Sequence, residues 1–258
     1  MSVGLSSGDN VTDDASVIRL ISYNMQVAIG SHRRRHLLSH GLRYLLPHAN
    51  AQANLNRIAE LVSDVDFVAL NEADAGSFRT RNINQALYIA KQQGYPGCEQ
   101  MITRDLGRLA QHSNSLLSHN LAVKVVRHRL PKPNDGRGLL ESHFIVNGRE
   151  LVILVTHLSL SRAVREVQLA YVATVVTQYS HVIVMGDLNC TFDSPELRNF
   201  MANSGLKAFE HGVATFPSWR PRRAIDHILI SDGLAFQRYS AIPEPLSDHL
   251  ALLAEVIW

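Results

Sequence analysis

The sequence predicts an α/β protein built from mixed, largely antiparallel β-sheets with helices packed against them. Apolar, β-branched runs typical of strands occur irregularly among segments of helical periodicity. Several strand-like runs also follow one another with only Gly, Pro and Asn turns between them. A doubly wound parallel sheet needs a helix between successive strands, so this order favours the mixed arrangement.

The first half of the chain predicts two strands and two helices. The strands are the apolar runs VIRLISYN and DFVALNE, and the first helix has Leu55, Ile58 and Val62 at helical spacing. In chain order, these four elements are expected at residues 17–24, 54–62, 66–72 and about 81–93.

The second half predicts further strands and two more helices. Four strand-like runs, NSLLS, LAVKVV, HFIVN and ELVILVT, precede a helix over about residues 162–178. After the strand HVIVMGD, Asp193 or Ser194 followed by Pro195 marks a helix start, because proline fits the first helical turn. The C-terminal strands are the runs AIDHILIS, LAFQRYSAI and HLALLAEVIW.

Length and composition favour one globular domain. The chain has 258 residues, of which 46% are hydrophobic and 19% charged, and this excludes a disordered, collagen-like or repeat protein. We expect a loose N-terminal tail at residues 1–16 and a single domain at residues 17–258. With no apolar run near the roughly 18 residues of a membrane helix, no signal-peptide pattern and two cysteines, we expect a soluble, cytoplasmic monomer.

The basic residues are mostly arginine. The net charge is +2, but from Arg19 onward the chain has 25 basic and 20 acidic residues, a net charge of +5. This is below the charge typical of a dedicated nucleic-acid binder. Twenty-one of the basic residues are Arg, whose planar fork suits phosphate oxygens, although a GC-rich genome would give the same bias.

Nearly every apolar strand ends at a residue able to bind a metal or a phosphate. These residues are Asn24, Glu72, His157, Asp187, Asn189, Asp226, Asp248 and His249. Rigid strands hold such side chains in fixed positions, as a preorganised site requires. The Asn, Asp and Glu oxygens are hard ligands that suit Mg²⁺ or Mn²⁺, and the histidines suit a phosphoryl oxygen. The combination points to metal-assisted hydrolysis of a phosphoester.

Each of these residues also has a purely structural explanation. Glu72 continues the buried face of its strand by the period-two rule, yet a carboxylate at a strand end often lies in solvent. Asp187 and Asn189, two residues apart, either project from one side of an extended chain or form an ordinary Asx turn. His157 also fits a core histidine. The shared order and chemistry of the set favour a site.

The motifs that contain these residues resemble those of one enzyme family. The matching stretches are ISYNMQV, FVALNEAD, HSNSLLS, LVTHLSLS, VIVMGDLNCTF, TFPSWRPRRAIDHILIS and LSDHLALL, in order over nearly the whole chain. The chain thus resembles the endonuclease/exonuclease/phosphatase superfamily, that of pancreatic deoxyribonuclease, abasic-site endonucleases, inositol polyphosphate 5-phosphatases and neutral sphingomyelinases. The resemblance implies a DNase I-like, four-layered α/β sandwich with two mixed β-sheets packed face to face and helices outside.

The resemblance also implies roles for the acidic and amide residues. Asn24 and Glu72 would hold a divalent metal, Mg²⁺ or Mn²⁺, with Asp248 near it. Asp187 would orient or deprotonate the attacking water, and Asn189 would contact the phosphate.

The remaining implied roles concern histidines and supporting groups. His249 would contact the scissile phosphate, Asp226 would orient His249, and His157 would be the second phosphate-facing histidine. Asn114 would support the site. One departure is Asn71, where the family often has Gln before the Glu; it leaves the metal ligand intact.

We expect the substrate to be a phosphodiester, with nucleic acid the favoured class. Trp219 would stack on a base, unless it only packs its loop. The arginines expected to bind flanking phosphates are Arg33, Arg34, Arg35, Arg79, Arg81, Arg220, Arg222 and Arg223. Clustered arginine also suits an inositol, lipid or other small phosphate ester, so a phosphatase or phospholipase is the alternative. A catalytically silent binding module would have lost a site residue, and none is missing.

Overall fold

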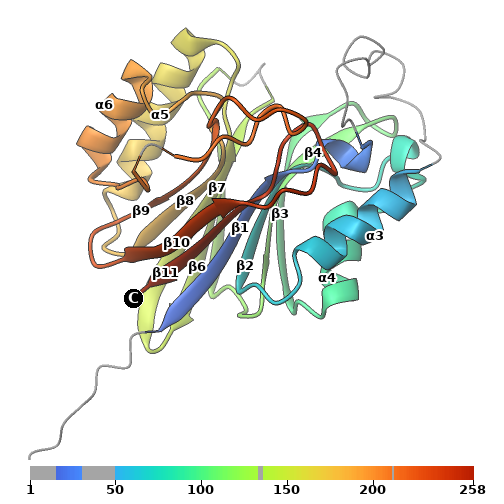
Figure 1. The fold of residues 1–258 in the computed structure, drawn as a ribbon, viewed down its shortest axis with the longest axis horizontal. Helices are drawn as coiled ribbons and strands as arrows, with labels where there is room; N and C mark the ends of the chain where they lie inside the picture. The colour runs from blue at the N-terminus through green and yellow to red at the C-terminus, as the bar shows by residue number, and fades with distance from the viewer. Residues whose placement is uncertain (1–15, 31–49, 133–135, 211) are drawn as a thin grey trace, which may run out of the picture.

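The computed structural model describes residues 16–30, 50–132, 136–210 and 212–258 (Figure 1). The expected N-terminal tail lies outside the described residues except for Ser16, and the arginine run at 33–35 lies outside them too. Ser16 is not loose, because its backbone exchanges two hydrogen bonds with that of Trp258, with N–O distances of 3.2 and 3.1 Å.

The described strands form two mixed β-sheets, as the sequence predicts. The six-stranded sheet has the order β10-β11-β1-β2-β4-β3, and the five-stranded sheet has the order β5-β6-β7-β8-β9. The β1–β2 and β7–β8 pairs are parallel, and the other pairs are antiparallel. The strand bounds of the first sheet are β1 Val17–Asn24, β2 Phe67–Asp74, β3 Gly97–Asp105, β4 Gln111–Ser118, β10 Ala235–Ala241 and β11 Leu252–Ile257. Those of the second are β5 Lys124–Arg129, β6 Gly138–Val146, β7 Arg149–His157, β8 Val182–Asp187 and β9 Asp226–Ile230.

Helices cover the outer face of each sheet, which makes four layers (Figure 1). Helices α3 and α4 lie on the six-stranded sheet, and α5 and α6 lie on the five-stranded sheet. Their bounds are α3 Ala51–Leu61, α4 Gln85–Gln93, α5 Arg162–Val176 and α6 Pro195–Ser204, with short 3₁₀ turns η1 Gln26–Ala28 and η2 Phe78–Thr80. Among the described residues, no helix combines the length and apolar composition needed to cross a membrane.

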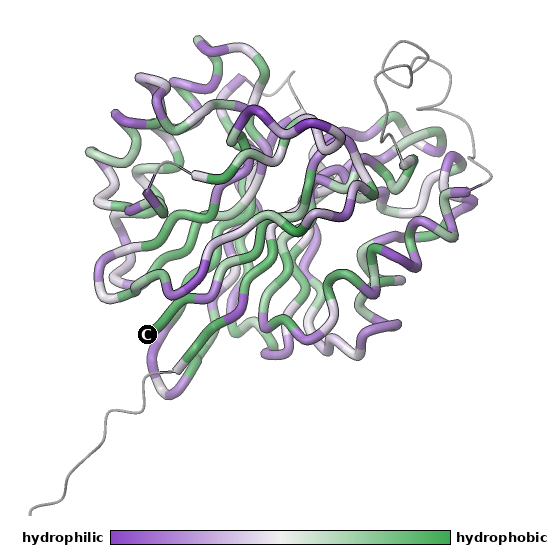
Figure 2. The backbone as a smooth tube through the Cα atoms, viewed as in Figure 1, coloured by the Kyte–Doolittle hydropathy of each residue, from purple (hydrophilic) through white to green (hydrophobic). Residues whose placement is uncertain are grey.

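Strand alternation divides the apolar side chains among three cores. Leu20 of β1 and Ile153 of β7 belong to the core between the sheets. Their neighbours Ile21 and Leu154 point the other way, into the cores beneath α3/α4 and α5/α6. All four are fully buried, and each such side chain stabilises the fold by about 1.5–3 kcal/mol. The central strands are accordingly mostly hydrophobic in the chain trace (Figure 2).

Several element bounds differ from the sequence prediction, and one strand was not expected. Helix α3 begins at Ala51, three residues earlier than expected, and β6 begins at Gly138, five residues before the run HFIVN. Helix α4 begins at Gln85, later than expected, because the Asn84 side chain accepts a hydrogen bond from Leu87 N and caps the helix there. Strand β3, at the sheet edge, was not predicted, because its sequence has no alternation of apolar and polar residues. Only Gly97 and Met101 of its nine residues are buried. The start of α6 is confirmed, with Ser194 as the cap and Pro195 in the first turn.

Candidate active site

A row of three asparagines marks one end of the six-stranded sheet. Asn24 of β1 is the register partner of Asn71 of β2, which in turn is the partner of Asn114 of β4. Register partners on neighbouring strands lie side by side, so the three amides form one line across the sheet. All three are buried.

The five-stranded sheet supplies a matching row of ionisable side chains. His157 of β7, Asp187 of β8 and Asp226 of β9 are register partners, and all are buried. Gly186 allows β8 to approach β7 just before Asp187. A Cβ atom at that position would lie 1.8 Å from the carbonyl oxygen of Thr156.

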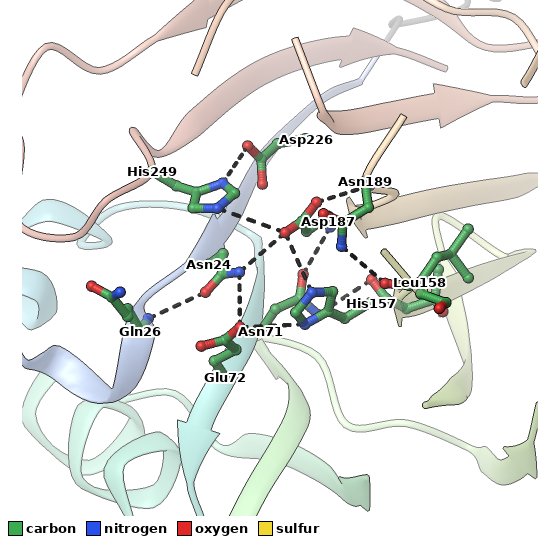
Figure 3. Close-up of polar contacts among 12 residues, drawn as sticks. Asn24, Gln26, Asn71, Glu72, His157, Leu158, Asp187, Asn189, Asp226 and His249 are labelled. Atoms are coloured by element: carbon green, nitrogen blue, oxygen red, sulfur yellow. Dashed lines mark hydrogen bonds and ion pairs between the residues drawn. The ribbon is translucent and has the colours of Figure 1, made fainter. Parts of the chain in front are cut away.

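Hydrogen bonds join the two rows across the sandwich (Figure 3). Asn24 Nδ2 donates to Asp187 Oδ2 at 3.1 Å, and the backbone N–H of Asp187 donates to Asn71 Oδ1 at 3.0 Å. Asn71 Nδ2 donates to Thr156 O at 3.3 Å and to Asn114 Oδ1 at 2.9 Å. Asp187 is therefore positioned by both sheets. Asn114 does not contact Asp187 in these bonds but accepts a hydrogen bond from Asn71 and so helps to orient the Asn71 amide.

Glu72 enters the site through a β-bulge. The pairing of β2 with β4 shifts between Asn71 and Ala73, and Glu72 has a φ of 56°. Its Oε1 lies 3.9 Å from His157 Nδ1 and 3.5 Å from Asn24 Nδ2. The expectation that Glu72 continues the buried face of its strand is wrong, because the bulge interrupts the alternation and turns the carboxylate towards the opposite sheet.

Asp226 holds His249 at the other side of Asp187 (Figure 3). His249 Nδ1 lies 2.8 Å from Asp226 Oδ2, and its Nε2 lies 3.7 Å from Asp187 Oδ2. The Thr215 hydroxyl donates to the same Asp226 oxygen, and the Phe216 ring lies 4.8 Å from the His249 ring, centroid to centroid. Thr215 opens the matching stretch TFPSWRPRRAIDHILIS, but sequence reasoning assigned it no role.

Asp248 lies beside a residue that sequence reasoning missed, Gln26. Gln26 Nε2 donates to Asp248 Oδ2 at 3.1 Å, and Ser247 Oγ donates to Asp248 Oδ1 at 3.2 Å. Gln26 has a φ of 43°, and its backbone N–H donates to Asn24 Oδ1 at 3.2 Å. The available signal was its place two residues after Asn24 in the YNMQ stretch.

Asp187 and Asn189 form an Asx turn, which was one of the two arrangements expected for them. Asn189 nevertheless lies in the site. Its backbone N–H donates to Asp187 Oδ1 at 2.9 Å, and its φ is 54°. Its Nδ2 donates to the carbonyl of Leu158 at 2.9 Å. The turn thus directs the chain after Asp187 while holding the orientation of its carboxylate.

The two histidines beside Asp187 differ in charge, because their pKa values are shifted in opposite directions. Burial alone would lower the pKa of His249, but the charges of Asp226 and Asp187 and the hydrogen bond with Asp226 outweigh it and raise that pKa to about 10. Burial lowers the pKa of His157 well below its usual value, and the charge of nearby Arg137 adds to this. At neutral pH the site therefore holds one imidazolium and one neutral imidazole.

The carboxylates on the Asn24 side fit a divalent cation. Burial raises the pKa of Asp248 to about 6, with repulsion from the Glu72 carboxylate adding to the effect of burial and the charge of His249 only partly opposing it. Gln26 Oε1 is buried there without a hydrogen-bond partner among the described residues. Oxygen donors from Asn24, Glu72, Asp248 and Gln26 are the kind that Mg²⁺ or Mn²⁺ prefers.

A second grouping of potential ligands is less suitable. Single ligand atoms of Asp187, Asp226 and His249 lie within 4.8 Å of one another. His249, however, is hydrogen-bonded to Asp226 through Nδ1, and the charges of Asp226 and Asp187 favour its protonated form, so a metal bound there would have to displace a proton.

Arg79 is not a surface phosphate ligand, contrary to expectation. It is buried, its Nε lies 2.5 Å from Asp74 Oδ2, and its Nη2 donates to the carbonyl of Gln111 at 3.1 Å. The buried Asp74 carboxylate requires a cationic partner, and Arg79 supplies it.

The other expected substrate contacts are accessible. Trp219 is partly exposed, and Arg81, Arg220, Arg222 and Arg223 are exposed. The loop that carries Trp219 adjoins the site, because Ser218 N donates to Asp248 O at 2.7 Å and Ser218 Oγ donates to Ser247 O at 2.6 Å.

Comparison with known proteins gives a family and a set of similar folds. The model of the Endonuclease/Exonuclease/phosphatase family matches residues 21–249. No curated protein sequence matches the chain significantly. An endonuclease/exonuclease/phosphatase from Beutenbergia cavernae is similar with a TM-score of 0.74 and 20% identity, over 93% of this chain and 71% of that one.

Two further solved structures show the same fold. A mannosyl-6-phosphatase from Bacteroides thetaiotaomicron has a TM-score of 0.70 and 16% identity, over 93% of this chain and all of the other. TDP2 from D. rerio, complexed with a single-strand DNA product, has a TM-score of 0.70 and 16% identity, over 93% and 99% of the two chains.

Proposed function

The chain belongs to the endonuclease/exonuclease/phosphatase family, and from this we infer that it is a divalent-metal-dependent hydrolase of phosphodiesters, with nucleic acid as the substrate class. The observation that supports this most strongly is the arrangement around Asp187. Its buried carboxylate lies between the imidazolium of His249 and the neutral imidazole of His157, at 3.7 and 3.4 Å.

Asp187 is suited to orient and deprotonate an attacking water. Burial raises the pKa of its carboxyl, against the opposing effect of the His249 charge. A carboxylate with a raised pKa is a stronger base than one in solvent. The hydrogen bonds that Asn24 Nδ2 and the backbone N–H of Asn189 donate to the Asp187 carboxylate fix its direction.

His249 is suited to stabilise the charge that develops on the phosphoryl oxygens. Its proton is retained because Asp226 faces Nδ1, while Nε2 points into the site. His157, being neutral, can donate a hydrogen bond without adding charge. A divalent cation held by Asn24, Glu72 and Asp248 would, when bound, neutralise charge on a phosphate oxygen and favour attack on phosphorus.

The loop beside Asp248 favours a polymeric substrate. Trp219 is partly exposed, and Arg220 and Arg222 next to it are exposed, so an aromatic surface and two cations adjoin the site. This combination suits stacked bases joined by phosphates. The similarity to the TDP2–DNA complex is consistent with that substrate class, whereas the mannosyl-6-phosphatase makes a monoester the necessary comparison.

The test is hydrolysis of bis(p-nitrophenyl) phosphate and of p-nitrophenyl phosphate, each with Mg²⁺, Mn²⁺ or EDTA. We expect cleavage that prefers the diester and is abolished by EDTA. Asp187→Ala should lower kcat by more than about tenfold, which corresponds to ~1.4 kcal/mol in the barrier. The matched control is Asp193→Ala, which removes a carboxylate that is 83% exposed. Preference for the monoester, or activity that survives EDTA, would contradict the proposal.

A further inference from the structure

A pocket lined by two arginines adjoins the candidate active site on the His157 side. Glu72 and His157 form the part of its wall that belongs to the site already described. Arg104, His112 and Arg137 extend the wall away from Asp187. Arg104 and Arg137 lie outside the family-matching stretches, and His112, which opens HSNSLLS, has no substrate-binding role assigned above.

The two sheets together build this pocket. Arg104 of β3 and His112 of β4 are register partners, so their side chains lie side by side. Arg137 comes from the other sheet, immediately before β6. Gly136, with a φ of 62°, lets the chain lie against β3: a Cβ atom there would be 3.1 Å from Arg104 Cβ and 3.3 Å from Thr103 O.

Positive charge accumulates around this pocket. Behind it, the Arg79 Nη1 atom lies 3.0 Å from His112 Nε2. Burial lowers the pKa of His112 to about 3, and the charges of Arg79, Arg104 and Arg137 contribute. Two guanidinium groups, those of Arg104 and Arg137, face the single carboxylate of Glu72 in the pocket lining, so the lining has an excess of positive charge that favours an anion.

From this geometry we propose that Arg104 and Arg137 bind a second phosphate group of the substrate, next to the scissile phosphate. The proposal rests on the proposed function and specifies it, because the pocket shares Glu72 and His157 with the reaction site. Guanidinium forks from two directions match the oxygens of a phosphate group. On a nucleic-acid strand this group is the neighbouring phosphate; on a small molecule it would be a second ester of the same compound.

The first test compares substrates that differ by one phosphate. Full-length protein with Mg²⁺ hydrolyses thymidine dinucleotides that carry a 5′-phosphate, a 3′-phosphate or neither. We expect kcat/KM to be at least about tenfold higher for one phosphorylated form, the scale of a charge-assisted hydrogen bond. In Arg104→Gln and in Arg137→Gln the ratio of phosphorylated to unphosphorylated substrate should fall towards one.

Arg238→Gln is the matched control, since Arg238 is exposed on β10, at the opposite edge of the six-stranded sheet from β3. It should retain the wild-type ratio. Equal kcat/KM for all three dinucleotides in the wild type would overturn the second-phosphate site. Arg104-dependent release of phosphate from a vicinal inositol bisphosphate, with no cleavage of dinucleotides, would retain the site and overturn the nucleic-acid substrate.

A binding measurement separates this proposal from the proposed function. Inorganic phosphate is titrated into EDTA-treated full-length protein and followed by calorimetry, so that no hydrolysis is needed. We expect Arg104→Gln to weaken binding about tenfold and Arg238→Gln to leave it unchanged. Equal binding by wild type and Arg104→Gln would refute the site even if diesters are cleaved. Loss of binding in Arg104→Gln would support the site even if no diester is cleaved.

Discussion

Replacing Gly186 by alanine perturbs the contact that brings β8 against β7 beside Asp187. The added Cβ would lie 1.8 Å from Thr156 O, whereas real Cβ contacts are essentially never under 3.0 Å. The strands must therefore separate locally by at least about 1.2 Å. The φ of 141° at Gly186 is also one that an alanine rarely adopts.

The magnitude follows from these two costs. An unfavourable backbone conformation costs about 1–3 kcal/mol, and overpacking adds about 1–3 kcal/mol, so we expect a loss of about 2–6 kcal/mol in the free energy of unfolding. A displacement of about 1 Å at Asp187 should also lower kcat/KM by about a hundredfold. That displacement would disturb the 3.4 Å separation from His157 and the 3.0 Å bond to Asn71.

Urea denaturation and kcat/KM on a chromogenic diester measure the two effects. Gly94→Ala is the matched control, because Gly94 also has positive φ, 71°, but a Cβ there would meet nothing within 4 Å. It should cost only the conformational term, about 1–2 kcal/mol, with unchanged activity. The reasoning is refuted if Gly186→Ala is no less stable than Gly94→Ala and retains wild-type activity.

Three further predictions concern individual carboxyl groups. Glu72→Gln should raise the Mg²⁺ concentration for half-maximal activity about tenfold or more, since a charged oxygen donor is lost; an unchanged Mg²⁺ titration would exclude Glu72 as a ligand. Asp226→Asn should lower kcat by about 10²–10⁴-fold, with the deficit growing as the pH rises, because the wild-type His249 keeps its proton up to about pH 10 and the variant loses it earlier. A deficit that does not change between pH 6 and 9 would contradict that role. Asp74→Asn should cost about 3–5 kcal/mol in urea denaturation, because Arg79 is left buried without its carboxylate. Burial alone would raise the pKa of Asp74, but hydrogen bonds from Ser77 and Arg79 outweigh burial and lower that pKa below its unfolded value of 3.8. The stabilisation that the ionised Asp74 contributes is therefore complete above pH 3.8 and is lost as the pH falls through the lowered pKa. A wild-type advantage that does not decrease as the pH falls below 3.8 would refute this.

The candidate site was predictable to the extent that it depends on strand ends. Asp187 and Asp226 were identified from apolar runs and short motifs, and the structure places them as register partners. Glu72 was identified as a site residue but on the wrong strand face, because no periodicity in the sequence indicates a bulge. Arg79 was expected in solvent, and its burial depends on Asp74, five residues earlier, being buried as well.

The sequence by itself determined the type and order of most elements and the identity of the residues at strand ends. These properties are local, since apolar periodicity, capping residues and turn residues act over a few neighbouring positions. Tertiary structure alone decided that Asn24 and Asn71 meet Asp187, and that Arg104 and Arg137 share one pocket. Such contacts join segments far apart in the chain, and they form only when sheet register, a bulge and a close glycine contact bring two sheets together.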